Sequence, residues 1–248
     1  ANIVHYVKIV KEKHILRNLI NASTQIAAEC YNPSHDADTL IDKAEQIIFD
    51  IASKKVESRS VPLKDIIRSS IETIDNLYQR KENITGLATG FRDLDMKTAG
   101  LQPSDLIVIA GRPSMGKSAL ATCIAEHVGV VEKKPVAFFS LEMSKEQLVQ
   151  RMLCSHARVD AHKVRTGFLS QADWPRLVNA AGKLSEAPIF IDDTPGASVL
   201  EIRAKARRLK AQHDIQLIVL DYLQLMQGPY GSDNRQQEIS EISRSLKA

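Results

Sequence analysis

The feature that most constrains the fold is a short loop between an apolar run and a helix-forming segment. Residues 111–118 read Gly-Arg-Pro-Ser-Met-Gly-Lys-Ser and fit the pattern G-x-x-x-x-G-K-[ST]. They follow the run Leu106–Ala110 and lead into a helical pattern over Lys117–Val130. A loop of this kind curls at its glycines, so that backbone N–H groups converge on phosphate oxygens at the positive end of the following helix. A loop can match the pattern by chance, but here both flanking segments supply the required context. The sequence therefore predicts a strand–loop–helix unit that binds a nucleoside triphosphate.

The composition is that of an ordinary globular protein and excludes several classes. The 248 residues are 44% hydrophobic and 25% charged, with a net charge of +3, which permits a polyanionic partner without requiring one. The three cysteines, Cys30, Cys123 and Cys154, form no CxxC pair, so we expect reduced thiols rather than a disulfide or a zinc site. No apolar run approaches the length of a membrane span, and no signal peptide is visible. We therefore expect a cytoplasmic protein without a membrane partner.

From residue 86 onward, strand candidates alternate with helical segments. The strand candidates are Leu106–Ala110, Val136–Ser140, Ile189–Asp192 and Ile215–Leu220, and the helical segments are Lys117–Val130, Lys145–Ala157, Gln171–Ser185 and Val199–His213. Such alternation predicts a parallel sheet with helices on both faces, and ligands of such sheets lie beyond the carboxyl ends of the strands. Residues 86–248 are therefore interpreted as an α/β domain that carries the phosphate loop.

Residues 1–85 contain no convincing strand. Apolar residues recur at helical spacing on both sides of the break at residues 32–34, which predicts a helical hairpin over residues 1–57. Residues 58–85 are interpreted as a linker around an amphipathic helix from Leu63 to Tyr78. The apolar stripe of that helix packs either on its own domain or on a neighbouring subunit, and the residues alone leave both open.

Both ends of the chain lie inside helical patterns. The chain opens on Ala1 without a methionine, and it closes at Ala248 in a helical segment that has no stop signal. We therefore interpret the chain as a fragment that lacks both ends, with the α/β domain truncated at its C-terminus.

An aspartate stands at the end of one strand candidate. Asp221 follows the apolar residues 217–220. In a sheet that also carries a phosphate loop, a carboxylate at this place holds Mg²⁺ together with the loop hydroxyl, here that of Ser118, while Lys117 reaches the outer phosphates. The alternative is a turn or capping aspartate. The phosphate loop in the same sheet favours the metal role.

A glutamate stands just past the strand candidate Val136–Ser140. Glu142 could orient and deprotonate the water that attacks the terminal phosphate. The alternative is a charge near the N-terminus of the next helix, which Ser144 is expected to cap. The residues alone do not decide between the two.

A polar loop follows the Asp221 strand. Residues 227–235 include Tyr230, which offers a face for base stacking, and Arg235, which offers a guanidinium for phosphate. Its position after the metal carboxylate makes the loop a candidate nucleic-acid contact, and a plain surface loop is the alternative.

Three motifs together resemble the bacterial replicative DNA helicases of the DnaB type. They are residues 112–118, Ser140-Leu141-Glu142-Met143 and Asp221-Tyr222-Leu223-Gln224-Leu225. The segments 89–95, 97–103 and 241–247 agree, so the likeness covers most of residues 86–248. Over residues 1–85 the likeness is looser and matches the end of that family's N-terminal collar domain and its linker helix. The resemblance implies a RecA-like ATPase that forms a hexameric ring around single-stranded DNA, translocates 5′ to 3′ and unwinds duplex at the replication fork.

The resemblance also implies cofactors and residue roles. ATP and Mg²⁺ are the implied cofactors, with Glu142 as the catalytic base, Lys117 as the phosphate-stabilising lysine, and Ser118 with Asp221 as the Mg²⁺ ligands. The residues implied to contact the nucleotide are Gly111, Arg112, Pro113, Ser114, Met115, Gly116, Lys117, Ser118 and Ala119. Residues 228–235 would be a central DNA-binding loop, with Tyr230 and Arg235 in contact with DNA.

The implied partners are single-stranded DNA, further copies of the chain, primase and a helicase loader. The hairpin would belong to the collar that contacts primase, and the linker helix would dock on the adjacent subunit. The family's arginine finger, sensor segment and second DNA loop would lie beyond Ala248, so the chain alone is expected to hydrolyse ATP poorly. Two other functions stay open: a recombination or repair ATPase of the RecA type, and a non-enzymatic assembly module that binds primase.

Overall fold

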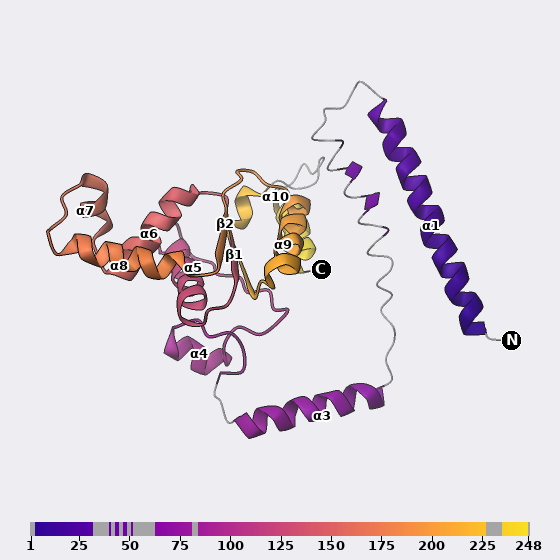
Figure 1. The fold of residues 1–248 in the computed structure, drawn as a ribbon, viewed down its shortest axis with the longest axis horizontal. Helices are drawn as coiled ribbons and strands as arrows, with labels where there is room; N and C mark the ends of the chain where they lie inside the picture. Colours follow the sequence, from indigo (N-terminus) through magenta and orange to yellow (C-terminus); the bar gives the residue numbers. More distant parts are fainter. Residues whose placement is uncertain are drawn as a thin grey trace. The chain divides into compact units, whose positions relative to one another are not determined.

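The chain divides into two compact units, residues 1–74 and residues 75–248. The computed structural model describes residues 3–31, 40, 43–44, 47–48, 51, 63–80, 84–226 and 235–247. Figure 1 shows the helical character of the first unit and the mixed architecture of the second. None of the described helices combines the length and apolar character that a membrane crossing requires.

The first unit is built on a long helix. Helix α1 spans Ile3–Cys30 and confirms the helical pattern predicted there. In the predicted second helix of the hairpin, residues 40, 43, 44, 47, 48 and 51 are helical, and the rest lies outside the described residues. An ion pair of 2.8 Å between Lys43 Nζ and Glu29 Oε2 joins the two segments.

The predicted amphipathic helix of the linker is present. Helix α3 spans Leu63–Arg80 and crosses the boundary between the two units. Its apolar stripe lies in solvent, with Ile67 at 47%, Ile71 at 60% and Tyr78 at 75% exposure. An apolar stripe of this size on one helix is typical of a surface that another protein surface covers.

The second unit is organised around a parallel sheet, as predicted. Strands β1 (Val136–Ser140), β2 (Ile189–Asp192) and β3 (Leu217–Asp221) lie in the order β2-β1-β3. The register pairs Ser140 with Asp221 and Phe139 with Asp192. The carboxyl ends of all three strands therefore meet at one edge. Strand β3 begins two residues later and ends one residue later than the predicted Ile215–Leu220, and Asp221 is its last residue.

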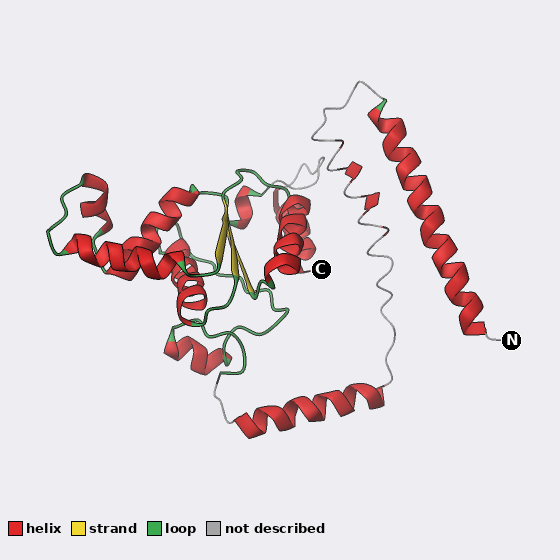
Figure 2. Ribbon diagram, viewed as in Figure 1, coloured by secondary structure: helices red, strands yellow, loops and turns green. Residues whose placement is uncertain are grey.

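Side chains that alternate along β1 divide the core between the two faces of the sheet. Val136 and Phe138 pack with α5 (Lys117–Glu126), the π-helical turn η1 (His127–Val131) and α6 (Lys145–Ala157). Ala137 and Phe139 pack on the other face with α9 (Val199–His213) and α10 (Arg235–Lys247). Figures 1 and 2 show these two helical layers on either side of the strands. The predicted covering of both faces is confirmed.

A third, smaller core lies among the outer helices. Ala157 at the end of α6 packs with Val164 of α7 (Ala161–Thr166) and Ala180 of α8 (Asp173–Ser185). The helical segment predicted at Gln171–Ser185 is thus confirmed, although it begins two residues later. Three short elements were not predicted: α4 (Arg92–Thr98), α7 and the 3₁₀ turn η2 (Leu223–Leu225).

The prediction of a strand at Leu106–Ala110 is wrong. These residues adopt no regular structure, and their side chains are exposed, with Val108 at 71%. A strand requires a neighbour that pairs with its N–H and C=O groups, and none of the described strands is hydrogen-bonded to this segment. The apolar run therefore has the composition of a buried strand without the pairing.

The central phenylalanine of β1 offers a test of this core. Phe138 is 1% exposed, so Phe138→Ala should lower the free energy of unfolding by about 3–5 kcal/mol through lost burial and a residual cavity. Chemical denaturation measures the loss. Phe168, at 82% exposure, provides the matched control, and Phe168→Ala should cost no more than about 0.5 kcal/mol. Equal losses in the two variants would contradict the packing described here.

Candidate active site

Residues 111–118 form a loop that leads directly into α5, as predicted, although none of the described strands precedes it. Gly116 adopts φ +87°, a left-handed conformation that favours glycine, and serves as the N-cap of α5. Ser114 is also left-handed, with φ +65°. The ammonium group of Lys117 donates a hydrogen bond of 2.9 Å to the carbonyl of Gly111 and so spans the loop from its end to its beginning.

The start of α5 presents donors without partners. The N–H groups of Gly116, Lys117 and Ser118 donate to no backbone carbonyl within the described residues, because the first turn of a helix lacks acceptors. The loop itself is exposed, and Met115 at its tip is 74% exposed. Free amides at the positive end of a helix dipole, with a lysine beside them, form an anion-binding surface.

Asp221 is a buried carboxylate at the carboxyl end of β3. The residue is 7% exposed, yet no described residue donates a hydrogen bond to its side chain. Helix α5, which begins at the phosphate loop, packs against β3. Its carboxylate oxygens are not among the enclosed, unpaired side-chain atoms of the described residues, so they stay accessible at the sheet edge, and an accessible carboxylate of this kind can serve as a ligand for a hard cation. Among the described residues no three His, Cys, Asp or Glu side chains gather into a metal site, so a cation here would also need phosphate and water oxygens as ligands.

Glu142 lies on a turn that joins β1 to α6. The segment from Ser140 to Lys145 is hydrogen-bonded to the ends of all three strands. The bonds run from the hydroxyl of Ser140 to the carbonyl of Met143 (2.7 Å), from the N–H of Leu141 to the carbonyl of Asp221 (2.7 Å), and from the N–H of Lys145 to the carboxylate of Asp193 (3.0 Å). The carboxylate of Glu142 itself is exposed, and no described residue pairs with it. The turn is thus fixed while its acid is free to act on a ligand.

The two acids at the end of β2, Asp192 in the strand and Asp193 just after it, are paired within the protein. The hydrogen bond from the Lys145 N–H, with the charge of its ammonium, lowers the pKa of Asp193. Burial tends to raise the pKa of Asp192, but hydrogen bonds from Thr194 and Lys205 outweigh it and lower the pKa. Lys205 Nζ lies 2.9 Å from Asp192 Oδ2. These two acids are thus paired within the protein, whereas no described residue pairs with the side chain of Asp221 or Glu142.

Two of the residues involved, Lys145 and Asp193, were not singled out from the sequence, and Ser140 was named only within a motif and given no role. The available signal was the pair Asp192-Asp193 at a strand end, since acids there face the same edge as Glu142. The predicted cap is confirmed, because the Ser144 hydroxyl accepts a hydrogen bond from the N–H of Gln147. Capping and the proposed chemistry of Glu142 are therefore served by different residues.

Of the two predicted DNA contacts, Tyr230 lies outside the described residues and Arg235 begins α10. The guanidinium of Arg235 forms an ion pair with Glu238 and donates to the carbonyls of Gln224 and Met226. Arg235 thereby joins the start of α10 to the segment after β3. Its DNA contact stays a prediction.

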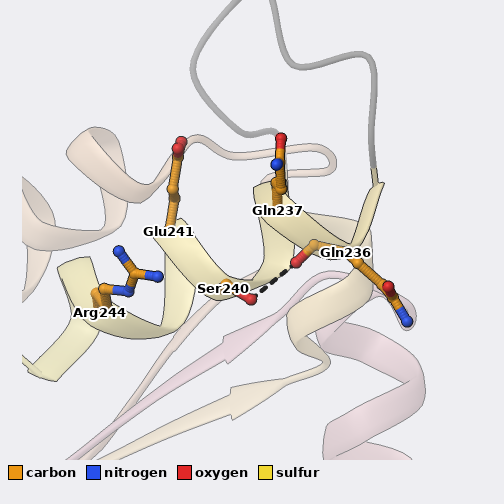
Figure 3. Close-up of a pocket in the computed structure, with 5 residues that line it drawn as sticks. All are labelled: Gln236, Gln237, Ser240, Glu241 and Arg244. Carbon is orange, nitrogen blue, oxygen red and sulfur yellow. Dashed lines mark hydrogen bonds between the residues drawn. The ribbon is translucent and has the colours of Figure 1, made fainter.

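The polar side of α10 borders an open hollow of about 550 Å³. Its lining residues are Gln236, Gln237, Ser240, Glu241 and Arg244. Figure 3 shows Gln237 and Glu241 on the same side of the helix, while the Ser240 hydroxyl donates to the Gln236 carbonyl. The lining includes neither the phosphate loop nor the two unpaired acids. The hollow is therefore separate from the candidate active site.

The whole chain is similar in sequence to known bacterial proteins. The chain is 49% identical to "Replicative DNA helicase DnaC" of Bacillus subtilis (strain 168) and 48% identical to "Replicative DNA helicase DnaB" of Geobacillus stearothermophilus. Each match covers 100% of this chain and 55% of the relative. The chain thus spans about half the length of these curated relatives.

Two solved structures share the fold. One is the structure of an ATPase domain, which matches 73% of this chain and 65% of its own, with a TM-score of 0.68 and 34% identity. "The Structure Of A DnaB-Like Replicative Helicase And Its Interactions With Primase" matches 97% of this chain and 55% of its own, with a TM-score of 0.73 and 31% identity. The second unit therefore has the RecA-like fold of helicase ATPase domains. The family described as the DnaB-like helicase C terminal domain matches residues 86–248. The chain belongs to the DnaB-like helicase family.

Proposed function

We propose that the protein is a replicative DNA helicase, in which ATP hydrolysis drives 5′ to 3′ translocation on single-stranded DNA and unwinding of duplex at the fork. The observation that carries the proposal is the pair of unpartnered acids, Asp221 and Glu142, at one edge of a sheet whose strand β3 packs against the phosphate-loop helix. Triphosphate hydrolysis needs a phosphate cradle, a cation ligand and a water-orienting acid. Membership of the DnaB-like helicase family supports DNA unwinding as the process that ATP hydrolysis drives.

The contacts support a role for each residue in this proposal. Residues 111–119 surround the phosphates, with the backbone N–H groups of Gly116, Lys117 and Ser118 as donors, and the ammonium of Lys117 moves from the Gly111 carbonyl to the outer phosphates when the nucleotide binds. Glu142 accepts a proton from the attacking water, because its carboxylate is exposed and free of an ion pair. The hydrogen-bonded turn keeps the backbone of Glu142 in place during the reaction.

Ser118 and Asp221 are the residues suited to hold Mg²⁺ with the nucleotide. A hard cation takes oxygen ligands, and the buried Asp221 carboxylate without a hydrogen-bond donor is such a ligand. The ion would neutralise charge on the phosphates during transfer. Ser118, in the first turn of α5, supplies a hydroxyl next to the phosphate-binding amides.

The same proposal extends to the partners. Single-stranded DNA would lie along residues 228–235, with Tyr230 and Arg235 in contact. The exposed stripe of α3 would be covered by the neighbouring subunit of a homohexameric ring. Primase would bind the collar that includes residues 1–57, since one of the similar solved structures concerns a DnaB-like replicative helicase and its interactions with primase. A helicase loader would place the ring on DNA in the cytoplasm, at the nucleoid.

Unwinding of forked substrates by the intact protein tests the proposal. We expect ATP-dependent unwinding of a fork with a free 5′ tail and none of a substrate with only a 3′ tail. Binding to single-stranded DNA should weaken steeply between low and moderate salt, because phosphate contacts release counterions. Strand exchange without unwinding would instead indicate a RecA-type recombination ATPase. Primase binding without any DNA-stimulated ATP hydrolysis would indicate an assembly module.

A further inference from the structure

The turn that carries Glu142 is clamped by two residues with no part in the proposed chemistry. We propose that Ser140 and Asp193 are positioning residues that fix the Glu142 carboxylate for reaction by holding its backbone from opposite sides. The inference rests on the proposed function, in which Glu142 activates the attacking water. It assigns to the site two residues that neither bind the nucleotide nor transfer a proton.

Ser140 closes the turn from the upstream side. Its side chain is buried, at 1% exposure, and its hydroxyl donates to the carbonyl of Met143 at 2.7 Å while accepting from the N–H of Met143 at 3.3 Å. One hydroxyl thus satisfies both backbone groups of the residue that follows Glu142. Because Ser140 is buried, water does not compete for its hydroxyl. The ring from Ser140 to Met143 therefore holds Glu142 in a single backbone conformation.

Asp193 holds the downstream side. It follows β2, and its carboxylate accepts the N–H of Lys145 at 3.0 Å and lies 3.5 Å from the ammonium of the same residue. Lys145 is the first residue of α6, where helix amides lack internal acceptors, so an acid there is favoured by both hydrogen bonding and the helix dipole. The contact joins residues that are 48 positions apart in the chain. It ties the Glu142 turn to the neighbouring strand.

The clamp acts on the backbone and leaves the reactive group free. The carboxylate of Glu142 has no partner among the described residues, whereas the residues on either side of it are bonded to β3, through the Asp221 carbonyl, and to Asp193. Rates of proton transfer depend on placement, and a displacement of about 1 Å can cost about 100-fold. Loss of either clamp should therefore lower turnover without changing the phosphate cradle.

Kinetics of the intact protein with Ser140→Ala and Asp193→Ala, which remove the hydroxyl and the acceptor of the Lys145 N–H respectively, test the inference. We expect each variant to lower kcat by about 10-fold or more, with the Kd for nucleotide within about twofold of wild type because no phosphate contact is lost. Asp193 is partly exposed, so its variant should fold even if the buried Ser140→Ala variant does not. Ser144→Ala is the matched control. Its hydroxyl accepts from the N–H of Gln147 inside α6 and bonds neither Met143 nor Lys145, so kcat should be unchanged.

A double-mutant cycle separates positioning from a general structural role. If Ser140 and Asp193 act through Glu142, each substitution should cause no further loss of kcat in the Glu142→Gln background. Losses that multiply in that background would overturn the inference, as would unchanged kcat in the single variants. If Glu142→Gln alone keeps its kcat, the proposed role of Glu142 fails, and the positioning role fails with it. Failure of the proposed role of Glu142 is distinguishable from failure of the positioning role alone, because it is seen in Glu142→Gln without a substitution at Ser140 or Asp193.

Discussion

Lys117→Ala should abolish nucleotide binding at concentrations that saturate the wild-type protein. The ammonium group sits at the start of α5 and donates to the Gly111 carbonyl across the phosphate loop. Hydrogen bonds to charged groups contribute about 1.5–3 kcal/mol each, so the loss of two phosphate contacts should weaken binding by about 100-fold or more. Titration with a fluorescent ATP analogue on the intact protein measures the change.

The control for this prediction is another lysine of the same domain. Lys183 is exposed on α8, outside the phosphate loop, and Lys183→Ala should leave the Kd unchanged. Lys117→Arg should restore little affinity, because a planar guanidinium does not replace a compact ammonium in a loop of this size. Wild-type affinity in Lys117→Ala would mean that residues 111–118 do not cradle the phosphates.

Secondary structure in the second unit could be predicted from sequence because pattern and packing agree there. Strands β1 and β2 and helices α6 and α9 have the predicted bounds. The apolar run before the phosphate loop shows the limit of that reasoning. Leu106–Ala110 has the composition of a buried strand, but composition does not show whether another strand is available to pair with it. Strand formation is a property of two segments, and the sequence pattern describes only one.

Contacts between distant side chains could not be predicted for a related reason. Asp193 reaches Lys145 only because β2 and β1 are adjacent and in register. The sequence placed Asp221 and Glu142 at strand ends, but it could not show that both lack partners while Asp192 and Asp193 are bonded. Of the four acids at this edge of the sheet, these contacts select the two that are available to a cation and to a water molecule.

Glu142→Gln should separate nucleotide binding from hydrolysis. The substitution keeps the size of the side chain and removes the group that accepts the proton of the attacking water. General base catalysis contributes about 10²–10⁴-fold, so kcat should fall by about 100-fold or more while the Kd for nucleotide stays within about twofold. Phosphate release measured beside equilibrium binding, both with the intact protein, gives the two quantities.

Glu146 provides the matched control for this last prediction. It lies four residues further on, exposed in the first turn of α6, where it has the helix-end position that was the alternative interpretation of Glu142. If Glu142 were also only a helix-end charge, Glu142→Gln and Glu146→Gln would both lower stability slightly and leave kcat unchanged. A selective loss of kcat in Glu142→Gln requires a chemical role. A loss of nucleotide affinity equal to that of Lys117→Ala would instead place Glu142 in the binding of the phosphates.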